Sequence, residues 1–100
     1  MNIESDRDGA VLAVKPEGRL DGNTAPKLEA ILRAELGEST SLILDFAGVD
    51  YISSAGLRVI LAMDQLMAGR GGSLKLIHVG EAVLSILDMT GFLDIIDVET

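Results

Sequence analysis

Two neighbouring serines, Ser53 and Ser54, stand directly before a long apolar pattern of helical spacing, and their hydroxyl groups are the clearest candidates for chemistry in this chain. The N-terminus of a helix presents free N–H groups and the positive end of the helix dipole, which together accommodate a phosphate. One interpretation is therefore a phosphorylation site. The other is that one serine caps the helix while its neighbour faces solvent, since serine is a preferred capping residue. The residue types alone leave both interpretations open.

The helix that follows the serines is expected from Ala55 to Ala68, and at 100° per residue its apolar side chains fall into two groups. The larger group spans about 120° of arc, the width that a helix normally buries, and consists of Val59, Ile60, Met63, Leu66 and Met67. The smaller group lies beside Arg58 and Gln65, is interrupted by Asp64, and consists of Leu57, Leu61 and Ala68. This second stripe predicts either a docking surface for a partner or an internal contact with another helix.

A phosphate on either serine would change the properties of such a docking surface. It adds about −1.5 to −2 charges at pH 7. Next to the Leu57 and Leu61 stripe, this charge would impose a desolvation cost on any interface formed there. The pattern therefore predicts that phosphorylation switches binding off.

Other chemistries find little support in the residues. His78 is the only histidine, and no Gly-x-Ser-x-Gly elbow surrounds either serine. Asp45, Asp50 and Asp64 fall in different expected elements, without the spacing of a metal-ligand set. The glycine-rich segment 69–72 lacks the lysine and serine of a P-loop, and the chain has no cysteine. We therefore expect no enzyme activity, no catalytic residue, no cofactor and no metal.

Composition narrows the classes of partner. The 100 residues include 8 Lys and Arg against 16 Asp and Glu, which gives a formal charge of −8 and disfavours binding to nucleic acid. The first twenty residues lack the basic start and apolar core of a secretory signal. The longest apolar runs fall far short of the roughly 20 residues that span a bilayer. We expect a cytoplasmic protein that does not insert into a membrane.

The elements that must position the serines alternate between strand and helix. Strands are expected at Ala10–Val14, ended by Pro16 and Gly18, with Met1–Ser5 paired beside it, and at Ser41–Phe46, Leu74–His78 and Asp94–Val98. Helices are expected at Ala25–Leu36, with Asn23 or Thr24 as its cap, at Ala55–Ala68 and at Glu81–Met89.

Two segments complete this pattern. Ala47–Ile52 contains Gly48 and Asp50 and is expected to form a loop. Ser41–Phe46 is a continuous apolar run typical of a strand covered on both faces. The order β β α β α β α β predicts one α/β domain over residues 1–100, a small layer fold with a mixed central sheet and helices packed against it.

The segment from 45 to 59 resembles bacterial anti-sigma factor antagonists with a STAS domain; it reads Asp45-Phe46-Ala47-Gly48-Val49-Asp50-Tyr51-Ile52-Ser53-Ser54-Ala55-Gly56-Leu57-Arg58-Val59. Further resemblance to the family lies in three shorter segments, which are Gly18–Asp21 followed by Thr24–Pro26, Gly71–Leu76, and Leu87–Phe92. The similarity covers nearly the whole chain in order. It implies the STAS-type version of the α/β layer fold.

The resemblance also implies a function. In the family, the unmodified antagonist binds an anti-sigma factor, commonly a serine kinase, and frees a sigma factor; phosphorylation of a serine blocks binding, and a phosphatase restores it. The matching acceptor here is Ser54, with Ser53 as the alternative, because Ser53 occupies a position where many members have aspartate. The partner-binding residues implied or expected in this region are Asp21, Asn23, Thr24, Ser53, Ser54, Ala55, Gly56, Leu57, Arg58 and Leu61.

A second function fits the same fold. A STAS-like accessory subunit could use the same helix face to dock on a membrane transporter, without any phosphorylation switch. The absence of a basic tail or hydrophobic anchor in the sequence favours the signalling role. The two functions differ in one property, since only the signalling antagonist should lose its partner when Ser54 is phosphorylated.

Overall fold

The computed structural model describes all residues from Met1 to Thr100. The strands are β1 (Asn2–Asp8), β2 (Val11–Leu20), β3 (Ser41–Asp45), β4 (Gly48–Ile52), β5 (Ser73–Ile77) and β6 (Asp97–Val98). The helices are α1 (Ala25–Leu36), α2 (Ser54–Gly69), α3 (Glu81–Met89) and the short 3₁₀ helix η1 (Phe92–Asp94). None of the helices is long and apolar enough to cross a membrane.

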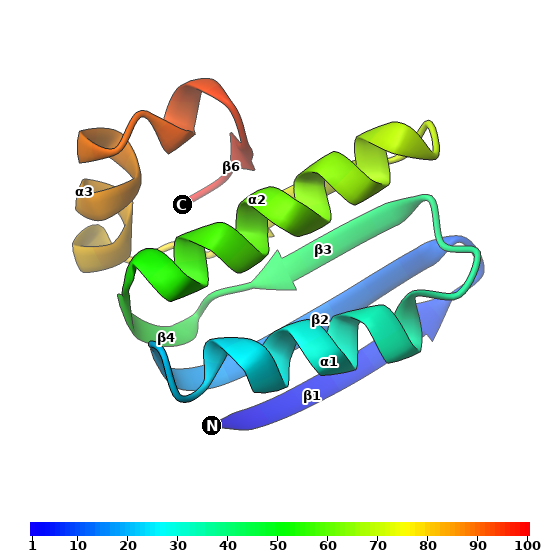
Figure 1. Cartoon of the computed structure of the whole chain (residues 1–100), viewed down its shortest axis with the longest axis horizontal. Coiled ribbons are helices and arrows are strands. Elements are labelled where there is room, and N and C mark those ends of the chain that lie inside the picture. The colour runs from blue at the N-terminus through cyan, green and yellow to red at the C-terminus, as the bar shows by residue number, and fades with distance from the viewer.

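One mixed sheet contains all the strands, in the order β1-β2-β3-β5-β6, with β4 paired to β2 (Figure 1). Only β1 and β2 are antiparallel, and every other pair is parallel. The strand β2 is long enough to pair with β3 along Val11–Val14 and with β4 along Glu17–Leu20. The mixed sheet with packed helices confirms the expected fold class.

The expectation of a loop over Ala47–Ile52 is wrong, because residues 48–52 form β4. Gly48 and Asp50 are typical of turns, but Val49 and Ile52 are buried and the segment pairs with the distal half of β2. The residue types of Pro16 and Gly18 suggested that the strand ends there, but β2 continues past both residues. Gly18 instead has φ 111° and adjoins a register shift at which Asp50 of β4 has no partner in β2, so β2 continues through the glycine and the bulge lies in β4.

The helices α1 and α2 lie side by side in front of the sheet in Figure 1. Burial alternates along β3, where Leu42 and Leu44 are buried and Ile43 is only half-buried. The expectation that this strand is covered on both faces is therefore wrong. Helices pack on one face, and the aliphatic side chain of Ile43 belongs to the other, partly exposed face.

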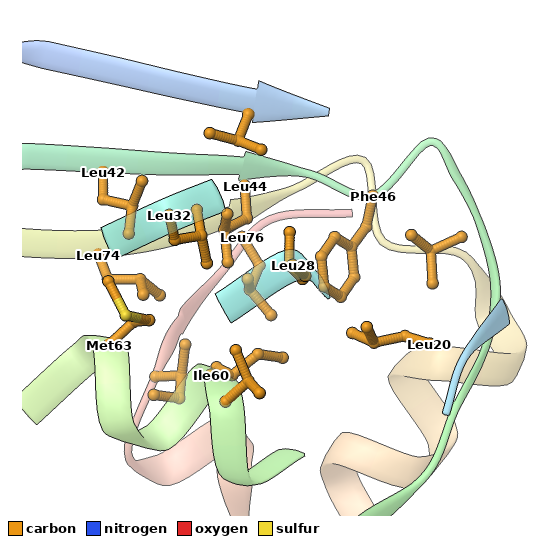
Figure 2. Close-up of a cluster of buried hydrophobic side chains, with 14 of the residues drawn as sticks. Leu20, Leu28, Leu32, Leu42, Leu44, Phe46, Ile60, Met63, Leu74 and Leu76 are labelled. Carbon is orange, nitrogen blue, oxygen red and sulfur yellow. The ribbon is translucent and has the colours of Figure 1, made fainter. Parts of the chain in front are cut away.

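A single core of 23 buried residues lies between the sheet and the helices. Figure 2 shows its centre, where Leu42, Leu44, Leu74 and Leu76 of the strands point toward Ile60 and Met63 of α2. Helix α1 contributes Leu28 and Leu32 to the same cluster. This packing anchors α2 along most of its length and so fixes the position of its first residue.

The C-terminal segment also differs from expectation. The predicted strand Asp94–Val98 is reduced to β6, because Asp94 belongs to η1 and Ile95 and Ile96 lie between η1 and β6. Ile95 is 58% exposed, whereas Ile96 is buried. Of the two isoleucines that suggested a longer strand, only Ile96 thus contributes to the core.

Candidate functional site

The site is built where β4 ends and α2 begins. The N–H of Ser53 donates a hydrogen bond to the carbonyl oxygen of Leu20 at 2.9 Å, which continues the pairing of β2 and β4 by one residue. The carbonyl oxygen of Ser53 then accepts the N–H of Leu57 at 3.0 Å and starts the helix. Ser53 is therefore held by backbone bonds on both sides, and Ser54 is the first helical residue.

The two serine hydroxyls are in different environments. Ser54 is exposed, whereas the Oγ atom of Ser53 is buried and has no hydrogen-bond partner. Ser53 occupies the N-cap position, but no side-chain hydrogen bond caps the helix. The interpretation that a serine side chain caps the helix is therefore wrong. Of the two hydroxyl groups, only that of Ser54 is accessible to a modifying enzyme.

The expectation that Gly56 and Leu57 belong to an exposed partner surface is wrong. Leu57 is only 8% exposed and is part of the core. A Cβ atom on Gly56 would lie 2.7 Å from Cγ1 of Ile52 and 2.8 Å from Cγ of Leu20. Both residues therefore hold the start of α2 against the ends of β2 and β4, which a helical wheel of α2 alone does not show.

The exposed face of α2 carries a different set of residues. At 100° per residue, a stripe within about 60° of arc contains Ser54, Arg58, Leu61 and Gln65. The last three also line a groove between α1 and α2, together with Ala25, Pro26, Glu29, Ala55, Val59 and Ala62. Of the predicted partner-binding residues, Ala55, Arg58 and Leu61 are thus brought together at the groove that Ser54 adjoins.

The turn before α1 is organised by the carboxylate of Asp21. Its Oδ1 accepts the N–H groups of Asn23 at 3.0 Å and Thr24 at 3.2 Å. The Thr24 hydroxyl donates to the carbonyl oxygen of Arg19 at 2.6 Å and accepts the N–H of Asp21 at 2.9 Å. Thr24, one of the two expected caps, does occupy the N-cap position, but its side chain makes no capping hydrogen bond to the helix, and the Asp21 carboxylate instead closes the turn that precedes α1.

These bonds change the pKa of Asp21. The N–H of Asn23 is the main cause that holds the pKa of this carboxyl below its usual value, and it outweighs the opposing effect of desolvation. The bonds from Thr24 and the charge of Arg19 act in the same direction. Asp21, Asn23 and Thr24 line a polar hollow that shares no residue with the groove between α1 and α2. The predicted partner-binding residues that line a groove or hollow are thus divided between two separate surfaces.

Arg19 is a residue of this region that the sequence did not single out. Its guanidinium lies 4.1 Å from the centre of the Tyr51 ring, and its Nε lies 3.8 Å from Oδ2 of Asp21. The contact with Tyr51 exists because Arg19 and Tyr51 are paired across β2 and β4. The residue pattern of neither strand predicts this contact.

His78 contacts an acid and not a serine. Its Nδ1 lies 3.0 Å from Oδ1 of Asp45, at the adjoining ends of β5 and β3. His78 also has φ 55°, a conformation uncommon for residues other than glycine. The pair joins two strand ends and does not form a nucleophile and base with Ser53 or Ser54.

Comparison with known proteins shows which family this chain belongs to. The sequence model of the STAS domain matches residues 2–100. The chain belongs to the STAS domain family. This confirms the resemblance found in the sequence, including the segment that contains Ser53 and Ser54.

Among STAS relatives, the anti-sigma-B factor antagonist of Bacillus subtilis (strain 168) is 30% identical over 98 residues, which cover 98% of this chain and 90% of the relative. The Thermotoga maritima protein TM1081 has the same fold, with a TM-score of 0.91 and 20% identity over 98% of this chain and 86% of that one. The Bacillus cell fate determinant SpoIIAA, in its phosphorylated form, has a TM-score of 0.76 and 15% identity over 99% of this chain and 92% of that one.

Proposed function

We propose that this STAS domain is an anti-sigma factor antagonist whose binding is switched off by phosphorylation of Ser54. The observation that carries the proposal is the exposed hydroxyl of Ser54 on the first turn of α2, next to the groove between α1 and α2. The buried Oγ of Ser53 favours Ser54 as the acceptor. The names of the curated relatives support the antagonist role.

The switch requires two enzymes that act on this chain. A serine kinase transfers the γ-phosphoryl group of ATP to the Oγ atom of Ser54, which loses its proton, and ADP leaves. A serine phosphatase hydrolyses the phosphoserine and releases inorganic phosphate. The kinase is either the anti-sigma factor itself or a separate protein. SpoIIAA, which shares the fold, has been solved in a phosphorylated form, and this supports the step.

Electrostatics explain why a phosphate at Ser54 should oppose binding. The unmodified groove contains the charged residues Glu29 and Arg58 only, along with a mostly apolar lining. A dianion at its end must be desolvated when a partner covers it, and the chain already carries a charge of −8. The phosphate therefore penalises the complex and leaves the fold of the exposed helix start intact.

The experiment compares Ser54→Ala with Ser54→Asp in binding to each anti-sigma factor encoded in the same genome, measured by calorimetry. Ser54→Ala should bind like the wild-type chain, and Ser54→Asp should bind at least about tenfold more weakly, since the charge must be desolvated. Ser53→Ala is the matched control, because it removes the neighbouring hydroxyl from a position closed to solvent.

Equal binding by Ser54→Ala and Ser54→Asp would reject the switch. A transporter-docking STAS domain would bind none of these anti-sigma factors in either form, and its own partner would remain bound in both states. Intact-mass analysis of the chain after incubation with ATP and each candidate kinase, followed by peptide mapping of the modified residue, supplies the second measurement. Phosphate found on a residue other than Ser54 would reject Ser54 as the acceptor.

A further inference from the structure

Arg58 is the charged residue of the groove that forms no ion pair. The other charged residue there, Glu29, is paired with Arg33, whose Nη2 lies 2.9 Å from its carboxylate. Arg58 is exposed and takes part in no salt bridge or side-chain hydrogen bond. The positions of α2 three or four residues away from it are uncharged, namely Ser54, Ala55, Leu61 and Ala62.

We propose that Arg58 binds the phosphate group of phosphorylated Ser54 within the same chain. The inference rests on the proposed function, because it requires a phosphate on Ser54. Residues four apart on a helix face each other, with Cβ atoms about 5–6 Å apart, and an acid that precedes a base is the more favourable orientation. The planar guanidinium also matches two phosphate oxygens at once.

The pair gives the switch a second component. In the unmodified chain the guanidinium of Arg58 is free at the groove and available to a carboxylate of a partner. After phosphorylation the same guanidinium is held by the Ser54 phosphate, and the groove has lost its free cation. Phosphorylation therefore removes an attractive contact in addition to placing a negative charge at the interface.

The ion pair can be tested without a partner or a kinase. Phosphoserine is introduced at position 54 during synthesis of the full chain, and the second pKa of the phosphate is measured by ³¹P NMR. Arg58→Gln should raise this pKa by roughly 0.3 unit relative to the chain that keeps Arg58, because the dianion loses its neighbouring cation. Arg58→Lys should give an intermediate value, and the difference should shrink in about 1 M salt, where the Debye length is about 3 Å.

Lys15→Gln is the matched control. It removes one positive charge from β2, at a half-buried position between the buried residues Val14 and Pro16. The phosphate pKa should stay within about 0.1 unit of the value in the phosphorylated parent chain, since screening in salt limits the effect of a distant charge. Equal shifts in Arg58→Gln and Lys15→Gln, or no shift in either, would overturn the proposed pair.

A failure of the pair differs from a failure of the switch. If phosphoserine at position 54 abolishes partner binding while Arg58→Gln leaves the phosphate pKa unchanged, the proposed function stands and the role of Arg58 is rejected. If the pKa shifts as expected and Ser54→Asp still binds its partner like Ser54→Ala, the pair stands and the switch is rejected.

Discussion

Gly56 shows how one missing side chain fixes the position of the site. A Cβ atom there would come within 2.7 Å of Ile52 and 2.8 Å of Leu20, the residues that end β4 and β2. The first turn of α2 can lie this close to both strands only because the position is glycine. The exposed hydroxyl of Ser54, two residues earlier, owes its placement to this contact.

Gly56→Ala should therefore destabilise the protein by about 1–3 kcal/mol, the usual cost of overpacking a core. Gly69→Ala is the control, because Gly69 is the last residue of the same helix and has no atom within 4 Å of the added methyl group. That change should stabilise the protein by up to about 1 kcal/mol. Urea unfolding measures both, and equal effects would contradict the packing role of Gly56.

Helix α2 is the element in which an apolar stripe divides into an internal and an external part. Leu57 is buried, Leu61 is half-buried along the groove and Ala68 is exposed. The two interpretations of this stripe thus apply to different residues of it. Leu57 makes an internal contact, and Leu61 remains a candidate for contact with a partner.

Alanine substitutions should separate the two leucines. Leu57→Ala should cost about 2–4 kcal/mol of unfolding free energy, because it removes buried methyl groups from the core. Leu61→Ala should cost less than about 1.5 kcal/mol of unfolding free energy, because the half-buried Leu61 side chain loses less buried apolar area than Leu57 does. It should instead weaken binding of the anti-sigma factor. Thermal unfolding measures the stability of both variants, and calorimetry measures their binding. A larger loss of stability from Leu61→Ala than from Leu57→Ala would contradict the internal role of Leu57.

At the scale of the whole molecule, a polar side-chain contact links the adjoining ends of β3 and β5. Asp45 at the end of β3 accepts the N–H of Ala47 at 3.0 Å and contacts His78 after β5. Desolvation raises the pKa of the Asp45 carboxyl, but these two hydrogen bonds, together with the charges of His78 and Lys15, outweigh it and hold the pKa below its usual value of 3.8.

The lowered pKa of Asp45 makes stability depend on pH. Because the carboxylate is favoured in the folded state, its contribution is complete well above pH 3.8 and is lost as the pH falls through the folded-state pKa. Asp45→Asn should lower the free energy of unfolding by about 1 kcal/mol at pH 7, and the difference from wild type should close in acid. Asp6→Asn, which removes an exposed carboxylate of β1, is the control for the net charge of −8. A difference that persists unchanged below pH 3 would contradict this role.

The helices and the serine pair could be identified from the sequence alone. Apolar residues at helical spacing, with Pro26 near one start and Gly37 past one end, place α1 at the predicted bounds, and α3 also has the predicted bounds. The two serines follow directly from their position ahead of α2. These features depend on residues that are close to one another in the sequence, and such local interactions can be recognised from the sequence itself.

Only the tertiary structure decided which of these residues are buried and which are exposed. Strand β4, the contact between Arg19 and Tyr51, and the burial of Leu57 all depend on pairing or packing between segments distant in sequence. The difference between the buried Oγ of Ser53 and the exposed Ser54 has the same origin, since the N–H of Ser53 is hydrogen-bonded to Leu20 at the end of β2. Register and packing are properties of two segments together, and the periodicity of one segment does not contain them.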